Sequence, residues 1–66
     1  MIVYGTEINN LKEAYMWLRE AWMYEPFNIY YEEHGESGYI SIEPVRGNEH
    51  PGYTIDSLKD FERFVY

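Results

Sequence analysis

The chain has no cysteine and little positive charge. Five Lys and Arg residues stand against twelve Asp and Glu residues in 66 positions, a formal net charge of −7. Without cysteine, neither disulfides nor thiolate metal sites can form, so packing alone must stabilise the fold. The acidic balance disfavours direct binding to nucleic acid or to anionic membranes, and a macromolecular partner is expected to be basic.

Long apolar runs are missing as well. No stretch of about 18 apolar residues occurs, so we expect no membrane span. The first residues lack the basic region followed by an apolar stretch that marks a secretory signal peptide, and a cytoplasmic location is therefore expected.

Aromatic residues are abundant, with two Trp, eight Tyr and three Phe. Each ring can bury roughly 150–250 Å², which supplies the material for one small core. A chain of this length is expected to form a single domain over residues 1–66.

The clearest element in the sequence is a helix over residues 11–24. Asn10 and Glu13 have capping-box spacing, and Pro26 is expected to close the helix. The predicted core stripe consists of Leu11, Ala14, Tyr15, Leu18, Ala21 and Trp22. Four apolar residues fall outside this stripe: Met16, Trp17, Met23 and Tyr24. The helix is therefore expected either to be sandwiched between two layers or to expose an apolar flank.

A β-hairpin is predicted after the helix. Phe27, Ile29 and Tyr31 alternate along the first strand, and Ile40 and Ile42 alternate along the second, across a turn at residues 34–37. Both apolar sets share one face if Glu33 lies opposite Gly38. Pro44 is expected to end the ladder or to mark an edge strand, because it has no N–H to donate.

Weaker patterns predict the other elements. Residues 1–4, followed by Gly5, favour a short strand or arm, and residues 45–52 favour a surface loop. Thr54 is expected to cap a last helix, in which apolar residues recur at helical spacing: Leu58, Phe61, Phe64 and Val65. The predicted fold is α+β with the order β-α-β-β-α, an antiparallel sheet with two helices packed on it.

The hairpin is the most polarised segment of the chain. Residues 27–43 contain no Lys or Arg but four acidic residues, Glu32, Glu33, Glu36 and Glu43, and Glu25 comes just before them. Tyr30 and Tyr39 are expected between the acids on the face opposite the apolar set. Such a surface can imitate the anionic edge of a nucleic acid and meet the Arg and Lys side chains that hold phosphates. The plainer interpretation is an ordinary polar, solvent-facing sheet surface.

Signals for catalysis or for a cofactor are weak. The two histidines, His34 and His50, each have a glutamate nearby, but their spacing does not support a metal site. There is no Gly-rich phosphate loop before a helix and no cysteine nucleophile. We expect neither an enzyme nor a bound cofactor.

The sequence leaves two hypotheses for function. The first is an acidic inhibitor that blocks a basic DNA- or RNA-binding surface through Glu32, Glu33, Glu36 and Glu43, with Tyr30 and Tyr39 between them and Glu25 nearby. In size, charge and aromatic content such a chain resembles the small anti-defence proteins of phages, of the anti-CRISPR and anti-restriction types. The alternative is a small adaptor or subunit that binds a protein, or a second copy in a homodimer, through Met16, Trp17, Met23 and Tyr24.

Overall fold

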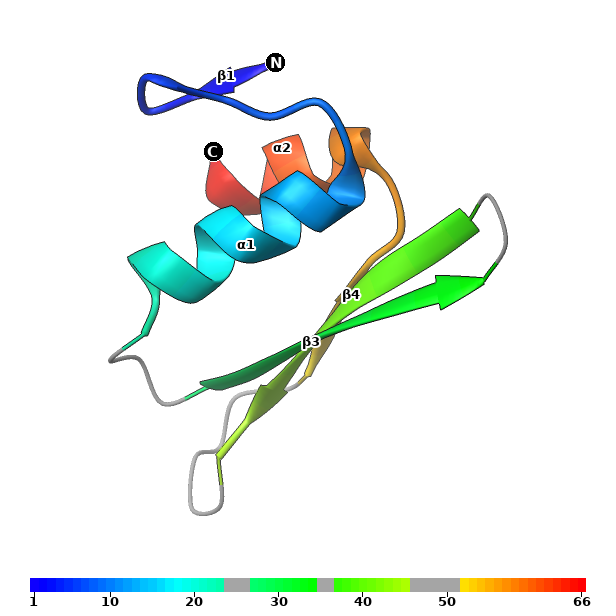
Figure 1. Ribbon diagram of the computed structural model, residues 1–66. Coiled ribbons are helices and arrows are strands. Elements are labelled where there is room, and N and C mark those ends of the chain that lie inside the picture. Colours follow the sequence, from blue (N-terminus) through cyan, green and yellow to red (C-terminus); the bar gives the residue numbers. More distant parts are fainter. Residues whose placement is uncertain (24–26, 35–36, 46–51) are drawn as a thin grey trace.

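The computed structural model describes residues 1–23, 27–34, 37–45 and 52–66. The described elements are β1 (Ile2–Val3), β2 (Thr6–Glu7), α1 (Leu11–Ala21), β3 (Phe27–His34), β4 (Ser37–Pro44), β5 (Tyr53–Ile55) and α2 (Leu58–Val65). The two helices lie between a small β1–β2 ribbon and an antiparallel sheet of order β3-β4-β5 (Figure 1). The α+β class and the two packed helices agree with the prediction, whereas β2 and β5 were not expected.

The N-terminal ribbon is a tight hairpin. Val3 pairs with Thr6, and the two turn residues between them have positive φ angles, 46° at Tyr4 and 85° at Gly5. This backbone twist matches that of two-residue hairpin loops, and glycine adopts it at low cost. Val3 and Ile8 are buried against the helices. A strand of two residues leaves no periodicity in a sequence, so the return strand was missed.

Helix α1 begins as predicted and ends earlier. The Asn10 side-chain oxygen Oδ1 accepts a hydrogen bond from the backbone N–H of Glu13 at 2.9 Å. A Glu13 carboxylate oxygen accepts from the backbone N–H of Asn9 at 3.2 Å. The helix ends at Ala21 with Trp22 as its C-cap, and the expected closure at Pro26 lies outside the described residues.

The core lies on both sides of the helices. Its buried residues are Val3, Ile8, Ala14, Leu18, Ile40, Ile42, Ile55 and Phe61. Val3 comes from β1 and Ile8 directly follows β2, whereas Ile40, Ile42 and Ile55 come from the three-stranded sheet. Helix α1 is therefore sandwiched, which was one of the two predicted outcomes.

Two predictions about the stripe of α1 were wrong. Ala21 is exposed, because the larger Trp22 ring covers that end of the core, 5.9 Å from the Phe27 ring and 5.1 Å from the Phe64 ring. Trp17 is half-buried and belongs to the packing. The Trp17 ring contacts the Phe61 ring edge-on, with centroids 5.9 Å apart. This side of α1 must be apolar because the β1–β2 ribbon forms a second layer there.

The hairpin register is the predicted one. Glu33 pairs with Gly38, Tyr31 with Ile40, and Ile29 with Ile42. A Cβ at Gly38 would lie 2.7 Å from the backbone carbonyl oxygen of Glu32, so the close approach of the strands requires glycine there. Pro44 is the last residue of β4, which is the central strand, and so it ends the ladder rather than marking an edge.

The predicted start of the last helix was wrong. Thr54 lies in β5, where it pairs with Ser41 of β4, and the helix cap is Ser57. The Ser57 hydroxyl accepts a hydrogen bond from the backbone N–H of Asp60 at 3.1 Å. The helical face was predicted correctly, with Phe61 buried and its neighbours packed around the core: Leu58, Phe64 and Val65.

Alanine substitutions distinguish the two possible caps. Ser57→Ala removes the acceptor of an orphan helix N–H and is expected to lower the free energy of unfolding by about 0.5–2 kcal/mol. Thr54→Ala alters an exposed strand residue and is expected to change it by less than about 0.5 kcal/mol. Urea unfolding followed by circular dichroism measures both. A larger loss for Thr54→Ala would contradict the assignment of the cap.

Candidate functional site

One face of the three-stranded sheet carries neither of the described helices, because α1 and α2 both pack on the other face (Figure 1). We call this surface the open face. Alternation along the strands places these residues on it: Asn28, Tyr30, Glu32 and His34 of β3, Tyr39, Ser41 and Glu43 of β4, and Thr54 of β5.

The middle of the open face is a neutral, aromatic strip. Tyr30 is 48% exposed, although it lies in the centre of β3, and it pairs with half-buried Ser41. Tyr39 is half-buried two positions further along β4. A tyrosine in such a position offers a rigid apolar ring and a hydrogen-bonding tip to a partner.

The two described carboxylates of the open face lie on either side of the Tyr30–Ser41 pair. Glu32 pairs with Tyr39, whereas Glu43 pairs with Asn28 at the other end. The two glutamates are four residues apart in the ladder, which corresponds to about 13 Å at a rise of about 3.3 Å per residue. Both glutamates are exposed.

His34 joins Glu32 and Tyr39 at the distal end of the hairpin. The imidazole Nε2 lies 3.3 Å from a Glu32 carboxylate oxygen, and the imidazole stacks on the Tyr39 ring with centroids 5.9 Å apart. The negative charge of Glu32 raises the pKa of the Tyr39 phenol, with smaller contributions from burial and from a hydrogen bond to Glu32. The three side chains form one contiguous polar group that is open to solvent.

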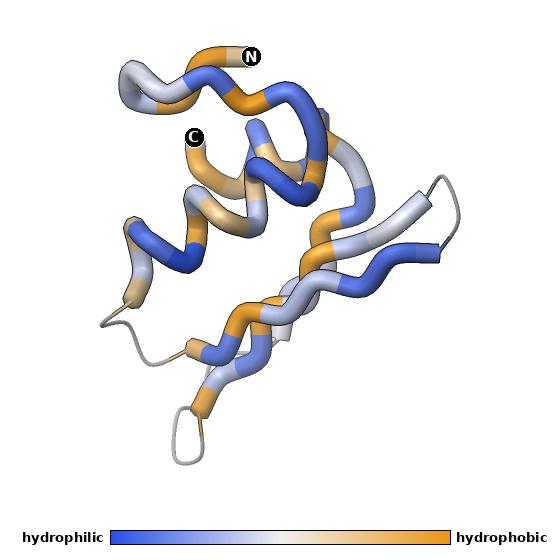
Figure 2. Tube along the Cα trace, viewed as in Figure 1, coloured by the Kyte–Doolittle hydropathy of each residue, from blue (hydrophilic) through white to orange (hydrophobic). Residues whose placement is uncertain are grey.

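The four acidic residues predicted as contacts do not form one surface. Glu32 and Glu43 lie on the open face, whereas Glu33 points to the helix-bearing side of the sheet, because successive strand residues alternate between faces. Glu25 and Glu36 lie outside the described residues. The described parts of the hairpin nevertheless contain no Lys or Arg, and Figure 2 shows their hydrophilic end at the tip of β3.

Two open-face residues were not predicted. His34 was predicted to lie in the hairpin turn, yet it pairs with Ser37 as the last pair of the ladder. The Ser37 hydroxyl donates a hydrogen bond to the His34 backbone carbonyl at 2.9 Å. Counting in steps of two from Tyr30 would have placed His34 on this face. Thr54 was missed because it was assigned to the helix cap.

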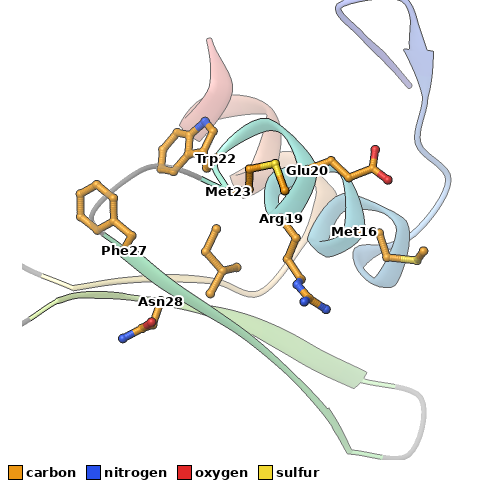
Figure 3. Close-up of a pocket in the computed structure, with 8 residues that line it drawn as sticks. Met16, Arg19, Glu20, Trp22, Met23, Phe27 and Asn28 are labelled. Atoms are coloured by element: carbon orange, nitrogen blue, oxygen red, sulfur yellow. The ribbon is translucent and has the colours of Figure 1, made fainter.

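A second surface lies between α1 and β3. We call it the α1–β3 groove; its volume is about 540 Å³, and it is lined by Met16, Arg19, Glu20, Trp22, Met23, Phe27, Asn28 and Ile29 (Figure 3). Met16 is 55% exposed and Met23 is 65% exposed, as the predicted apolar flank requires. Trp17 does not line this groove, and Tyr24 lies outside the described residues.

Within the described residues, His, Asp and Glu side chains do not gather in threes in a way that could hold a metal ion. His50 is outside that part of the chain.

Neither described helix is long and apolar enough to cross a membrane. Comparisons with protein-family models, with curated proteins and with solved structures found no match for this chain.

Glu32→Gln tests the electrostatics at the distal end. Removal of the Glu32 charge takes away the largest cause of the raised Tyr39 pKa, so the phenol is expected to titrate closer to its ordinary value of 10.0. The measurement is the carbon-13 shift of the Tyr39 ring followed through an alkaline titration. Glu43→Gln, at the other end of the open face, is the matched control and is expected to leave Tyr39 unchanged. An unaltered Tyr39 titration in Glu32→Gln would contradict the contact.

Proposed function

We propose that this chain is a non-enzymatic binding protein that covers a basic surface of a protein partner with its open face. The observation that carries this proposal is the composition of that face. Tyr30 lies between Glu32 and Glu43, Tyr39 lies beside Glu32, and the described hairpin contains no Lys or Arg. Such a surface is complementary to exposed arginine and lysine side chains.

The chemistry of recognition follows from these residue types. A guanidinium stacked on a tyrosine ring contributes about 0.5–1 kcal/mol at an exposed site and more when it is desolvated. A carboxylate can accept two parallel hydrogen bonds from the same guanidinium. The two glutamates, Glu32 and Glu43, are about 13 Å apart by strand rise and can therefore hold two basic side chains. Tyr30 covers the surface between them, and Tyr39 covers the surface beside Glu32.

The finer proposal is that the covered surface is one that holds DNA or RNA, so that the chain inhibits its partner. The net charge of −7 supports it, because long-range attraction speeds encounter with strongly basic proteins. Two carboxylates so far apart do not reproduce a row of successive phosphates. The chain would therefore imitate nucleic acid by competing for two basic residues of the partner and for the surface between them.

A small adaptor that binds through the apolar flank of α1 is the second candidate. The exposure of Met16 and Met23 favours it, because Met is adaptable and common at binding surfaces. Half-buried Trp17 packs on Phe61 and contributes less to such a flank.

Capture experiments with a matched pair of variants test the open face. The immobilised chain is incubated with a nuclease-treated cell lysate, and retained proteins are eluted with duplex DNA. We expect the double variant Glu32→Gln, Glu43→Gln to retain at least about tenfold less of the DNA-displaceable proteins, because two charge-assisted contacts are lost. Retention by the unmodified chain should also fall steeply as salt is added.

The control removes the same charge elsewhere. Glu7→Gln with Glu62→Gln changes two exposed carboxylates on β2 and α2, away from the open face. This variant is expected to retain nearly as much protein as the unmodified chain. Equal losses in both double variants would show that net charge alone is responsible, and retained proteins that DNA cannot displace would contradict the inhibitor proposal.

A further inference from the structure

From Asn28 onward, the outer edge of strand β3 is long and borders none of the described strands; we call it the free edge. The strand pairs with β4 on its other side. Sheet edges in natural proteins are commonly blocked by lysine, proline, bulges or short strands. β3 has eight residues, and its first five, residues 27–31, include no charged residue and no proline. By contrast, the opposite edge strand β5 has only three residues.

The α1–β3 groove runs beside the same strand. Phe27 and Ile29 line it from β3, while Met16, Trp22 and Met23 line it from α1. Figure 3 shows Phe27 on the side of β3 that faces the helix, whereas Asn28 points to the other side. A strand added at this edge would continue the same alternation and direct every second side chain into the space under α1.

We infer that an extended segment of a basic partner binds as a fourth strand along the outer edge of β3. Main-chain hydrogen bonds to β3 supply affinity, and apolar side chains at alternate positions enter the α1–β3 groove and supply specificity. Positions two apart in a strand are separated by about 6.6 Å. Two or three apolar residues, at positions i, i+2 and i+4, therefore span the lining from Met23 to Met16.

The charges around the groove determine which kind of partner segment can bind. Glu20 borders the groove, and Glu32 and Glu33 lie at the far end of the free edge, both exposed. Among the described residues that line the groove, the cation is Arg19, whose guanidinium lies over the Tyr15 ring at 5.6 Å. With a net charge of −7 on the whole chain, the fitting segment carries Lys or Arg between its apolar residues and at the end beside Glu32 and Glu33.

A second copy of the chain fits the edge less well. Helix α1 packs on β3, so two copies joined through their β3 edges would bring both α1 helices over the same junction. The like charges of two such acidic chains also oppose this contact.

A synthetic probe tests the inference directly. The probe is a seven-residue peptide of alternating lysine and valine with both ends blocked, added to nitrogen-15-labelled chain with labelled methionine methyl groups. We expect chemical-shift changes and slower amide exchange in residues 28–31, shifts at the Met16 and Met23 methyls, and little change in β5. A twin peptide with N-methyl groups at every second residue is expected to bind at least tenfold more weakly, because it cannot complete the ladder. Replacing lysine by glutamate should abolish binding.

Variants separate this surface from the open face. Met16→Gln with Met23→Gln alters two exposed side chains and is expected to weaken binding of the lysine–valine peptide at least tenfold, with an unchanged unfolding midpoint. Thr54→Ala, on β5 at the opposite side of the sheet, is the control and should bind the peptide normally. Equal binding of the N-methylated twin, shifts confined to Tyr30, Tyr39 and Ser41, or no binding would overturn the inference. Sedimentation showing a dimer joined through β3 without peptide would do so as well.

Discussion

The sandwiching of the two helices between separate β layers is the constraint on which the rest of the structure depends. A chain of 66 residues without cysteine has one small core, and α1 must supply it with apolar residues on two sides. Phe61 of α2 completes the centre, buried beneath Trp17. The ribbon is held at its edge by the chain ends: Tyr66 Oη donates to the Ile2 carbonyl and Tyr4 Oη to the Val65 carbonyl, each at 3.4 Å.

This arrangement leaves the other side of the sheet without a described helix. Both helices are needed between the layers, so neither is available for the second face of β3-β4-β5. A three-stranded antiparallel sheet can have one face exposed to solvent, because successive residues alternate between its two faces and polar residues occupy the exposed one. The choice of residues goes beyond solubility. Tyr30 exposes half of a large ring where a smaller polar side chain would serve as well, and the basic residues common on such faces are absent from the described hairpin.

The sequence predicted those parts of the fold that have a repeating pattern of sufficient length. The β3–β4 register followed from two independent alternations and one short turn, and the start of α1 followed from Asn10 and Glu13. β2 and β5 were missed because two or three residues carry no period, and because Thr54 and Ser57 are both good caps. Trp17 was assigned to the flank because the sequence predicted only one apolar stripe on α1. A single stripe packs against one layer, and it does not account for the β1–β2 ribbon on the other side of the helix. The glutamates were grouped by their nearness in sequence, whereas the strand distributes them by face.

That distribution gives β3 two separate roles in the proposals. Glu32 lies on the open face and Glu33 on the helix-bearing side, so one acidic dipeptide contributes potential to both surfaces. A basic partner attracted at long range could use the open face through arginine side chains and the free edge through its own backbone, since the two contacts require different groups of β3. The edge demands an extended segment with alternating apolar residues, whereas the face demands only cations at a suitable spacing. Specificity is therefore expected from the edge and rapid, salt-sensitive association from the face, because directional backbone pairing discriminates between segments and screened charge does not.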